Sequence, residues 1–256
     1  MPLTAKQAIS LGLVQGPAEV LPLSSSAHAE LIPELLGWDR SGISDADRKT
    51  FQVALHAGSF VVLARAIKWP RPAAAVAMTA PAVVAGVALE DAIEQRLSGP
   101  VATAIGLIAG SLLLIAADSA APAGERDTAD LSLADAAVIG VVQAAALAPG
   151  LSRLGMATAA ARLRGFSRAD AALIAHSAGL PVGAGAVVLK SARAISRPPA
   201  PEMRAPLAAG AVAAAGATRL SLPLLRRTPI AGAALWRMLL AVATLHRRGF
   251  RQNGGR

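Results

Sequence analysis

Apolar and polar residues alternate along this chain in long blocks, with apolar runs separated by short polar turns. Six runs are long enough, or nearly so, to cross a bilayer as helices, and they cover residues 51–67, 73–89, 100–117, 170–189, 205–225 and 229–245. Two other apolar runs, 5–14 and 131–148, lead instead into short polar segments. The pattern predicts an all-α polytopic membrane protein in which two of the helices are interrupted.

Composition supports a membrane protein and excludes other classes. Of the 256 residues 54% are hydrophobic and 16% are charged, whereas soluble domains carry about 25% charged residues. Cysteine is absent, which excludes disulfides and thiol chemistry. The net charge of +9 does not indicate nucleic-acid binding, because aromatic residues make up only 3% and tyrosine is missing. The basic residues instead flank the apolar runs, where they serve as topology and headgroup signals.

The domain organisation follows from the shortness of the polar segments. None is long enough to form a soluble domain, so residues 1–256 are predicted to be a single membrane domain. The basic tail, 247–256, is expected to be frayed. Basic clusters at 226–227 and 246–256 lie on either side of one predicted span, so they give no consistent orientation by the positive-inside rule.

The first polar segment, residues 15–28, places ionisable and hydroxyl groups inside apolar sequence. Such groups are costly to hold away from water unless they are paired or used. Pro17 and Pro22 remove backbone donors, which favours a broken or re-entrant helix over a plain span. The polar members of the segment are Gln15, Glu19, Ser24, Ser25, Ser26 and His28.

A second polar segment, residues 149–153, follows a run that resembles the beginning of the chain. Residues 8–15 read A-I-S-L-G-L-V-Q and residues 136–143 read A-A-V-I-G-V-V-Q, and each run is followed by a proline and then a serine. We interpret this as an internal duplication with halves at about 1–117 and 131–246. Paired broken helices in two halves are typical of proteins with a binding site near the bilayer midplane.

The residue types in the two segments fit a site that binds phosphate. Arg153 can grip a phosphate with two parallel hydrogen bonds. Ser24, Ser25 and Ser26 lie where a new helix would begin, and a helix N-terminus binds anions through its free N–H groups. Gly150 and Ser152 are predicted to do the same from the other side.

The spacing within the first segment suggests acid–base chemistry. His28 follows Ser25 by three residues, so on a helix the two share a face and the imidazole could activate the hydroxyl. Glu19 follows Gln15 by four residues, and it is predicted to orient His28, to transfer a proton, or to hold a divalent cation, Mg²⁺ or Ca²⁺, together with substrate oxygens.

Structural roles compete with these assignments. Serines in membrane helices usually bond to the backbone or to a neighbouring helix, and Arg153 would otherwise be an interfacial anchor. We interpret His56 and His176 as packing residues. A set of downstream arginines is interpreted as contacts to lipid headgroups: Arg162, Arg164 and Arg168.

With these residues in place, the chain resembles the undecaprenyl-diphosphate phosphatases, which recycle the bacterial cell-wall lipid carrier. One family signature is a Glu or Gln, three residues, Glu, and then L-P-x-S-S-x-x-H, which residues 15–28 match. The other, P-G-x-S-R-S-x-x-T, is met at Pro149, Gly150, Ser152 and Arg153. Similarity extends to 51–59 and 165–168. The resemblance implies inverted repeats with re-entrant helices, a multi-pass protein of the bacterial inner membrane, a divalent cation, and phosphate release from a polyprenyl diphosphate.

The chain departs from the family pattern at three positions, and two of these departures thin the expected hydroxyl shell. Leu154 and Ala157 replace a serine and a threonine that the resemblance places beside the phosphate, and Ala27 replaces a glycine. A phosphatidic-acid-type phosphatase is rejected, because Ala159 stands where that class needs a histidine. The alternative function is a non-catalytic lipid-phosphate transporter or flippase on the same duplicated fold.

Overall fold

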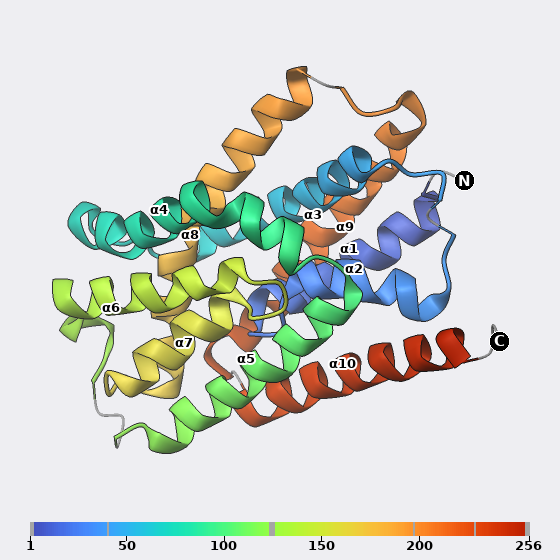
Figure 1. Ribbon diagram of the computed structural model, residues 1–256. Helices are drawn as coiled ribbons and strands as arrows, with labels where there is room; N and C mark the ends of the chain where they lie inside the picture. The colour runs from blue at the N-terminus through green and yellow to red at the C-terminus, as the bar shows by residue number, and fades with distance from the viewer. Residues whose placement is uncertain (1–2, 40, 123–125, 197, 228, 254–256) are drawn as a thin grey trace.

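The chain folds into ten α-helices within the part that the structure, a computed structural model, describes: residues 3–39, 41–122, 126–196, 198–227 and 229–253 (Figure 1). No strand forms in these ranges, so the predicted all-α class is confirmed. The helices are α1 (Ala5–Val20), α2 (Ser25–Leu36), α3 (Asp45–Ala66), α4 (Pro72–Arg96), α5 (Pro100–Ala120), α6 (Leu133–Ala144), α7 (Arg153–Leu163), α8 (Arg168–Ser196), α9 (Arg204–Ser221) and α10 (Ile230–Asn253).

Four of the described helical segments are long and apolar enough to cross a membrane, in agreement with the predicted polytopic class. They are Pro72–Leu89, Pro100–Ala120, Arg168–Leu189 and Pro201–Arg227. The predicted spans at 51–67 and 229–245 are helical but do not meet this standard. The reason is charge, because α3 opens on D-A-D-R-K and α10 carries Arg237 within its apolar part.

Both predicted helix interruptions are present. Helix α1 ends at Val20 and α2 begins at Ser25. In the second segment, α6 passes through a short 3-10 turn, Ala145–Leu147, before the chain breaks and α7 begins at Arg153. We call residues 21–24 the first break and residues 148–152 the second break.

The expectation that Pro17 interrupts the first helix is wrong. Pro17 lies inside α1, which continues for three more residues. A proline inside a helix removes one backbone hydrogen bond, but here the next turn closes because the Leu21 N–H donates to the Pro17 carbonyl at 2.9 Å. The interruption falls at Pro22 instead.

The two breaks share an uncommon backbone conformation. Ser24 and Ser152, each the residue just before a new helix, have φ values of 68° and 67°, and they are the only described residues other than glycine with positive φ. Left-handed backbone is rare for residues with a side chain. The equivalent strain at equivalent places supports the predicted duplication, which stays a prediction.

Small residues let the interrupted helices approach their neighbours closely. Helix α1 packs on α9, and a Cβ added at Gly12 or Gly16 would lie within 2.5 Å of α9 atoms. Helix α6 packs on α4 in the same way, where a Cβ at Gly140 would lie 2.5 Å from the Ala77 carbonyl oxygen. Small residues at helix contacts are typical of membrane proteins. This packing fixes the position of α1 against α9, and therefore the position of the polar side chains near the end of α1.

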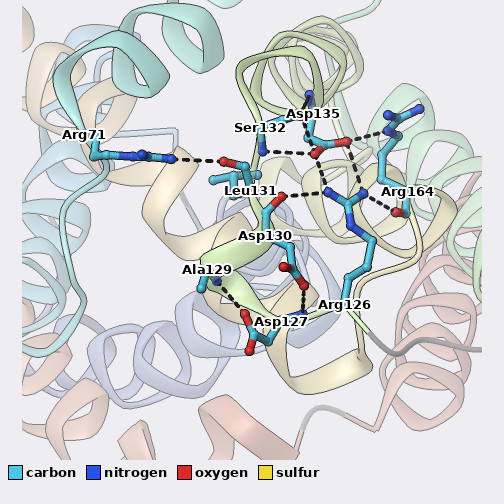
Figure 2. Close-up of polar contacts among 9 residues, drawn as sticks. All are labelled: Arg71, Arg126, Asp127, Ala129, Asp130, Leu131, Ser132, Asp135 and Arg164. Carbon is cyan, nitrogen blue, oxygen red and sulfur yellow. Dashed lines mark hydrogen bonds and ion pairs between the residues drawn. The ribbon is translucent and has the colours of Figure 1, made fainter.

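A network of polar contacts surrounds Asp135 near the start of α6 (Figure 2). Asp135 is fully buried and pairs with Arg126 at 2.6 Å and with Arg164 at 2.7 Å. The guanidinium of Arg126 also donates to the Asp130 and Arg164 carbonyls and lies 4.2 Å over the ring of Phe166. The hydrogen bond to Asp135 raises the pKa of Arg126. The network fastens the segment before α6 to the turn between α7 and α8.

This network corrects our interpretation of the downstream arginines as headgroup contacts. Arg162 and Arg168 both pair with Asp118, at 2.7 and 2.9 Å, and Arg164 pairs with Asp135. Their charges are therefore paired with carboxylates of the protein, although the Arg164 and Arg168 side chains are 44% and 65% exposed.

The C-terminal tail at 247–256 was predicted to be frayed. Residues 254–256 lie outside the described residues, but α10 continues to Asn253, and Arg248 lies 3.4 Å from Glu34 of α2.

We expect Gly16→Ala to loosen α1 against α9. The added methyl would lie 2.4 Å from a backbone carbon of Ala217, which cannot rotate away, and overpacking of this kind costs about 1–3 kcal/mol. The thermal midpoint of the detergent-solubilised protein should fall. Gly216→Ala is the matched control on α9, because no atom lies within 4 Å of its added Cβ. Equal midpoints for the two variants would contradict this packing.

Candidate active site

The centre of the candidate site is the carboxylate of Glu19, near the end of α1. Its Oε2 atom lies 3.0 Å from Nε2 of Gln15, one turn earlier, and 3.2 Å from Nδ1 of His56 on α3. The same Gln15 and His56 nitrogens are 3.1 Å apart. We assign both N–H groups as donors to Glu19, because the other choice would leave an imidazole lone pair facing a carboxylate. Glu19 is thus held from two sides.

The second break brings its arginine to the same carboxylate. Nη2 of Arg153, the first residue of α7, lies 3.9 Å from Oε1 of Glu19. The hydroxyl of Ser25, the first residue of α2, also interacts with this carboxylate. The two polar segments therefore meet around Glu19. The Arg153 side chain is 35% exposed and that of Glu19 is 16% exposed, so the guanidinium remains reachable from outside while the carboxylate is mostly covered.

Two helix N-termini converge at this point. Helices α2 and α7 begin at Ser25 and Arg153, the residues that reach Glu19. Ser24 makes no side-chain cap to α2, so the first N–H groups of α2 are not satisfied by that hydroxyl. An anion placed there would gain both free donors and the positive end of the helix dipole. The arrangement therefore offers an anion the Arg153 guanidinium and the start of α2, with the Glu19 carboxylate beside them; binding of an anion there stays a prediction.

The other predicted binding residues have more local roles in this conformation. The hydroxyl of Ser152 accepts from the Gly155 N–H at 3.2 Å and caps α7. Ser26 is exposed on α2. Gly150 packs against α5, where an added Cβ would lie 2.2 Å from the Thr103 carbonyl oxygen. Their contact with a substrate stays a prediction.

The expected pairing of His28 with Ser25 is not made here, which is a correction. His28 is 2% exposed, and both of its ring nitrogens are used elsewhere. Nδ1 lies 2.9 Å from the Ser24 carbonyl, and Nε2 accepts from Nε1 of Trp236 at 2.7 Å. The side chain turns toward α10 because the indole and the carbonyl of the break satisfy it there. His28 therefore shapes the first break rather than bonding to the hydroxyl.

His56 was interpreted as a packing residue, but its Nδ1 atom lies 3.2 Å from the Glu19 carboxylate, so its ring also contacts the candidate site. A histidine inside an apolar run is a signal that could have pointed to this contact. His176, by contrast, bonds to the backbone as a packing residue would: its Nε2 lies 2.9 Å from the Val20 carbonyl at the end of α1.

Sequence reasoning also missed Arg237 of α10. This arginine is fully buried, and its guanidinium donates to carbonyl oxygens of both breaks. A lone arginine within the apolar run 229–245 was a detectable signal, because a charge placed there must be paired or functional. Its partners were not detectable, since they are backbone atoms far away in the sequence.

Two of the three departures from the family pattern, Leu154 and Ala157, lie in helix packing. Ala157 is fully buried in an apolar cluster with residues of α4, α6 and α8, and Leu154 packs against the same cluster. A hydroxyl at position 157 would therefore be placed among apolar side chains. The idea that these two residues thin a hydroxyl shell in contact with the phosphate does not fit this arrangement.

The donor set around Glu19 suits a cation that arrives with its ligand. No group of three His, Cys, Asp or Glu side chains capable of holding a metal occurs among the described residues. Magnesium commonly uses only one or two carboxylates and takes its remaining oxygens from phosphates and water. Glu19 is the one member of this group of four that presents oxygens, since Gln15, His56 and Arg153 present nitrogens to it, and a cation at this carboxylate stays a prediction.

Comparison with known proteins places this arrangement in context. Residues 8–243 match the family described as bacitracin resistance protein BacA. The undecaprenyl-diphosphatase of Geobacter sulfurreducens is 39% identical over 242 residues, which is 85% of this chain and 87% of that protein. The proteins of the same name from Elusimicrobium minutum and Gemmatimonas aurantiaca are 36% and 33% identical, over 73% and 88% of this chain and 76% and 89% of their own lengths.

We expect the proton of a neutral His28 to reside on Nδ1. A tryptophan N–H only donates, so the ring nitrogen that faces Trp236 must accept. Nitrogen NMR of histidine-labelled protein tests this, with the His28 signals among the four histidines identified by their loss in His28→Gln. Trp236→Phe should relax the tautomer preference, and Trp69→Phe, the control, should not. A proton found on Nε2 would contradict the hydrogen bond.

Proposed function

This chain belongs to the bacitracin resistance protein BacA family, and we propose that it is a membrane phosphatase that hydrolyses undecaprenyl diphosphate to undecaprenyl phosphate and inorganic phosphate. Its relatives from Geobacter sulfurreducens, Elusimicrobium minutum and Gemmatimonas aurantiaca are all named undecaprenyl-diphosphatase. We place the protein in the bacterial inner membrane, where such an enzyme would recycle the lipid carrier of cell-wall synthesis.

One observation carries the proposal: a carboxylate, a serine hydroxyl and an arginine meet at the start of two helices. Glu19 interacts with Ser25, the first residue of α2, and lies 3.9 Å from the guanidinium of Arg153, the first residue of α7. A phosphoryl group bound there would meet a nucleophile, a base and a charge-neutralising donor at once. Stabilisation of charge by fixed donors is usually the largest single contribution to such catalysis.

In the proposed reaction, Ser25 attacks the terminal phosphorus of the lipid diphosphate. Its proton passes to Glu19, and the bond between that phosphorus and the bridging oxygen breaks, so that undecaprenyl phosphate leaves with the electron pair. Glu19 releases this proton to solvent. Water then attacks the phosphorus of the phosphoserine, the bond from phosphorus to Oγ breaks, and one proton of the water passes through Glu19 to Oγ, which frees inorganic phosphate and restores the hydroxyl. Arg153 holds the oxygens of the transferred group in both steps.

Gln15 and His56 orient the carboxylate of Glu19, the proposed base. Their N–H groups lie 3.0 and 3.2 Å from one Glu19 oxygen, which fixes the rotamer of the carboxylate and leaves the other oxygen toward Arg153. A divalent cation, which we propose is held by Glu19 and the diphosphate, would neutralise charge on the leaving group.

The transporter alternative has less support. The relatives are named for a diphosphatase activity, and a transporter has no need of a hydroxyl set against a carboxylate. A binding site alone would be satisfied by Arg153 and the helix N-termini.

The test is phosphate release from undecaprenyl diphosphate by the purified protein in detergent. Ser25→Ala and Arg153→Lys should each lower kcat about a hundredfold or more, because an essential nucleophile or a two-pronged donor is lost. Ser10→Ala and Arg219→Lys are matched controls at exposed positions and should retain full activity. A folded wild-type protein that binds the lipid but releases no phosphate would establish the transporter instead.

We further expect Glu19 and His56 to differ in importance. Glu19→Gln removes the base and should lower kcat about a hundredfold or more. His56→Ala removes a hydrogen bond to a charged group, worth about 1.5–3 kcal/mol, and should lower kcat about ten- to hundredfold. His56→Asn, which can still donate to the carboxylate, should be closer to wild type, and His246→Ala is the exposed control. Unchanged turnover in His56→Ala would remove His56 from the site.

A further inference from the structure

Arg237 lies at the junction of the two interrupted helices. Its Nη1 atom donates to the Pro22 carbonyl of the first break at 3.3 Å. Its Nη2 atom donates to the Gly150 and Leu151 carbonyls of the second break, at 3.0 and 3.2 Å. One planar group thus bonds to each break through a different nitrogen, a spacing that the single nitrogen of a lysine ammonium does not reproduce.

The surrounding helices leave room for this side chain. A Cβ added at Gly110 of α5 would lie 2.3 Å from Nη2, and one added at Gly155 of α7 would lie 3.0 Å from Nη1. Arg237 is fully buried, and its Nε atom is buried without a hydrogen-bond partner among the described residues. The guanidinium therefore occupies a space that glycines of α5 and α7 leave open, and it is shielded from solvent.

The charge of Arg237 is balanced by backbone rather than by a carboxylate. None of the ion pairs found among the described residues includes it. Its acceptors are the carbonyls of Pro22, Gly150 and Leu151, which lie within the breaks and carry the partial negative charge of backbone oxygens. The same two breaks are followed by the N-termini of α2 and α7, which face the candidate site.

From this geometry we infer that Arg237 is a positioning residue for the reaction proposed above, on which this inference rests. It draws the carbonyls of both breaks to one side, so that Ser25 and Arg153, which follow those breaks, are held at a fixed separation. Arg237 does not touch Glu19 in this structure. It acts through the two breaks, and its effect should appear in kcat more than in KM.

A double-mutant cycle tests this role through activity. Arg237→Lys keeps a charge but cannot serve both breaks, so kcat should fall at least tenfold with KM changed less than threefold. In an Arg153→Lys background the same substitution should cost much less, because the residue that it positions is already lost. Arg219→Lys is the matched control and should have no effect in either background. Equal and independent losses would overturn the inference, whereas an inactive wild-type protein would overturn the proposed function.

A second measurement does not depend on activity. The chain has no cysteine, so spin labels at Leu36→Cys and Leu163→Cys report only on the ends of α2 and α7, where both side chains are exposed. We expect a narrow distance distribution in the otherwise native protein and in Arg219→Lys, and a broadened or shifted one in Arg237→Lys. An unchanged distribution in Arg237→Lys, in protein that remains folded and monodisperse, would show that the breaks do not need this clamp.

Discussion

The candidate site depends on a buried guanidinium that satisfies backbone carbonyls at two helix interruptions. A helix that breaks inside a membrane protein exposes polar backbone groups, which are tolerated only where other groups satisfy them. Here Arg237 bonds to the carbonyls of Pro22, Gly150 and Leu151. These carbonyls point toward Arg237 of α10. The N-termini of α2 and α7, which follow the two breaks, remain available to the candidate site. The polar backbone of the breaks thereby becomes part of the site.

The first break is completed by two histidines from different helices. His176 of α8 bonds to the Val20 carbonyl and His28 of α2 bonds to that of Ser24. Each histidine serves a different backbone oxygen, so the irregular segment is held along its length. This division explains why His28 is not beside the Ser25 hydroxyl. Its two nitrogens are occupied by Ser24 and Trp236, and the base nearest to Ser25 is Glu19.

Close packing sets the position of the carboxylate as firmly as its hydrogen bonds do. Gly12 and Gly16 bring α1 against α9, and Glu19 lies within one turn of Gly16. His56 of α3 contacts the same carboxylate. The ionic network of Asp135 and its arginines lies elsewhere, at the start of α6, where it secures the entry to the second interrupted helix (Figure 2). Small residues and charges therefore both serve to hold the two halves of the site in place.

The sequence by itself determined the helical class and the two interruptions, and it selected Glu19, Ser25 and Arg153 as members of one candidate site. These features follow from local properties: apolar run length, proline positions, and the cost of polar groups in apolar surroundings. Only the tertiary structure decided which groups meet. Pro17 remained inside α1, His28 turned to Trp236, and His56 joined Glu19, because each outcome depends on a partner from a distant helix. Arg237 shows the limit most clearly, since its partners are backbone carbonyls, which carry no residue-specific signal in the sequence.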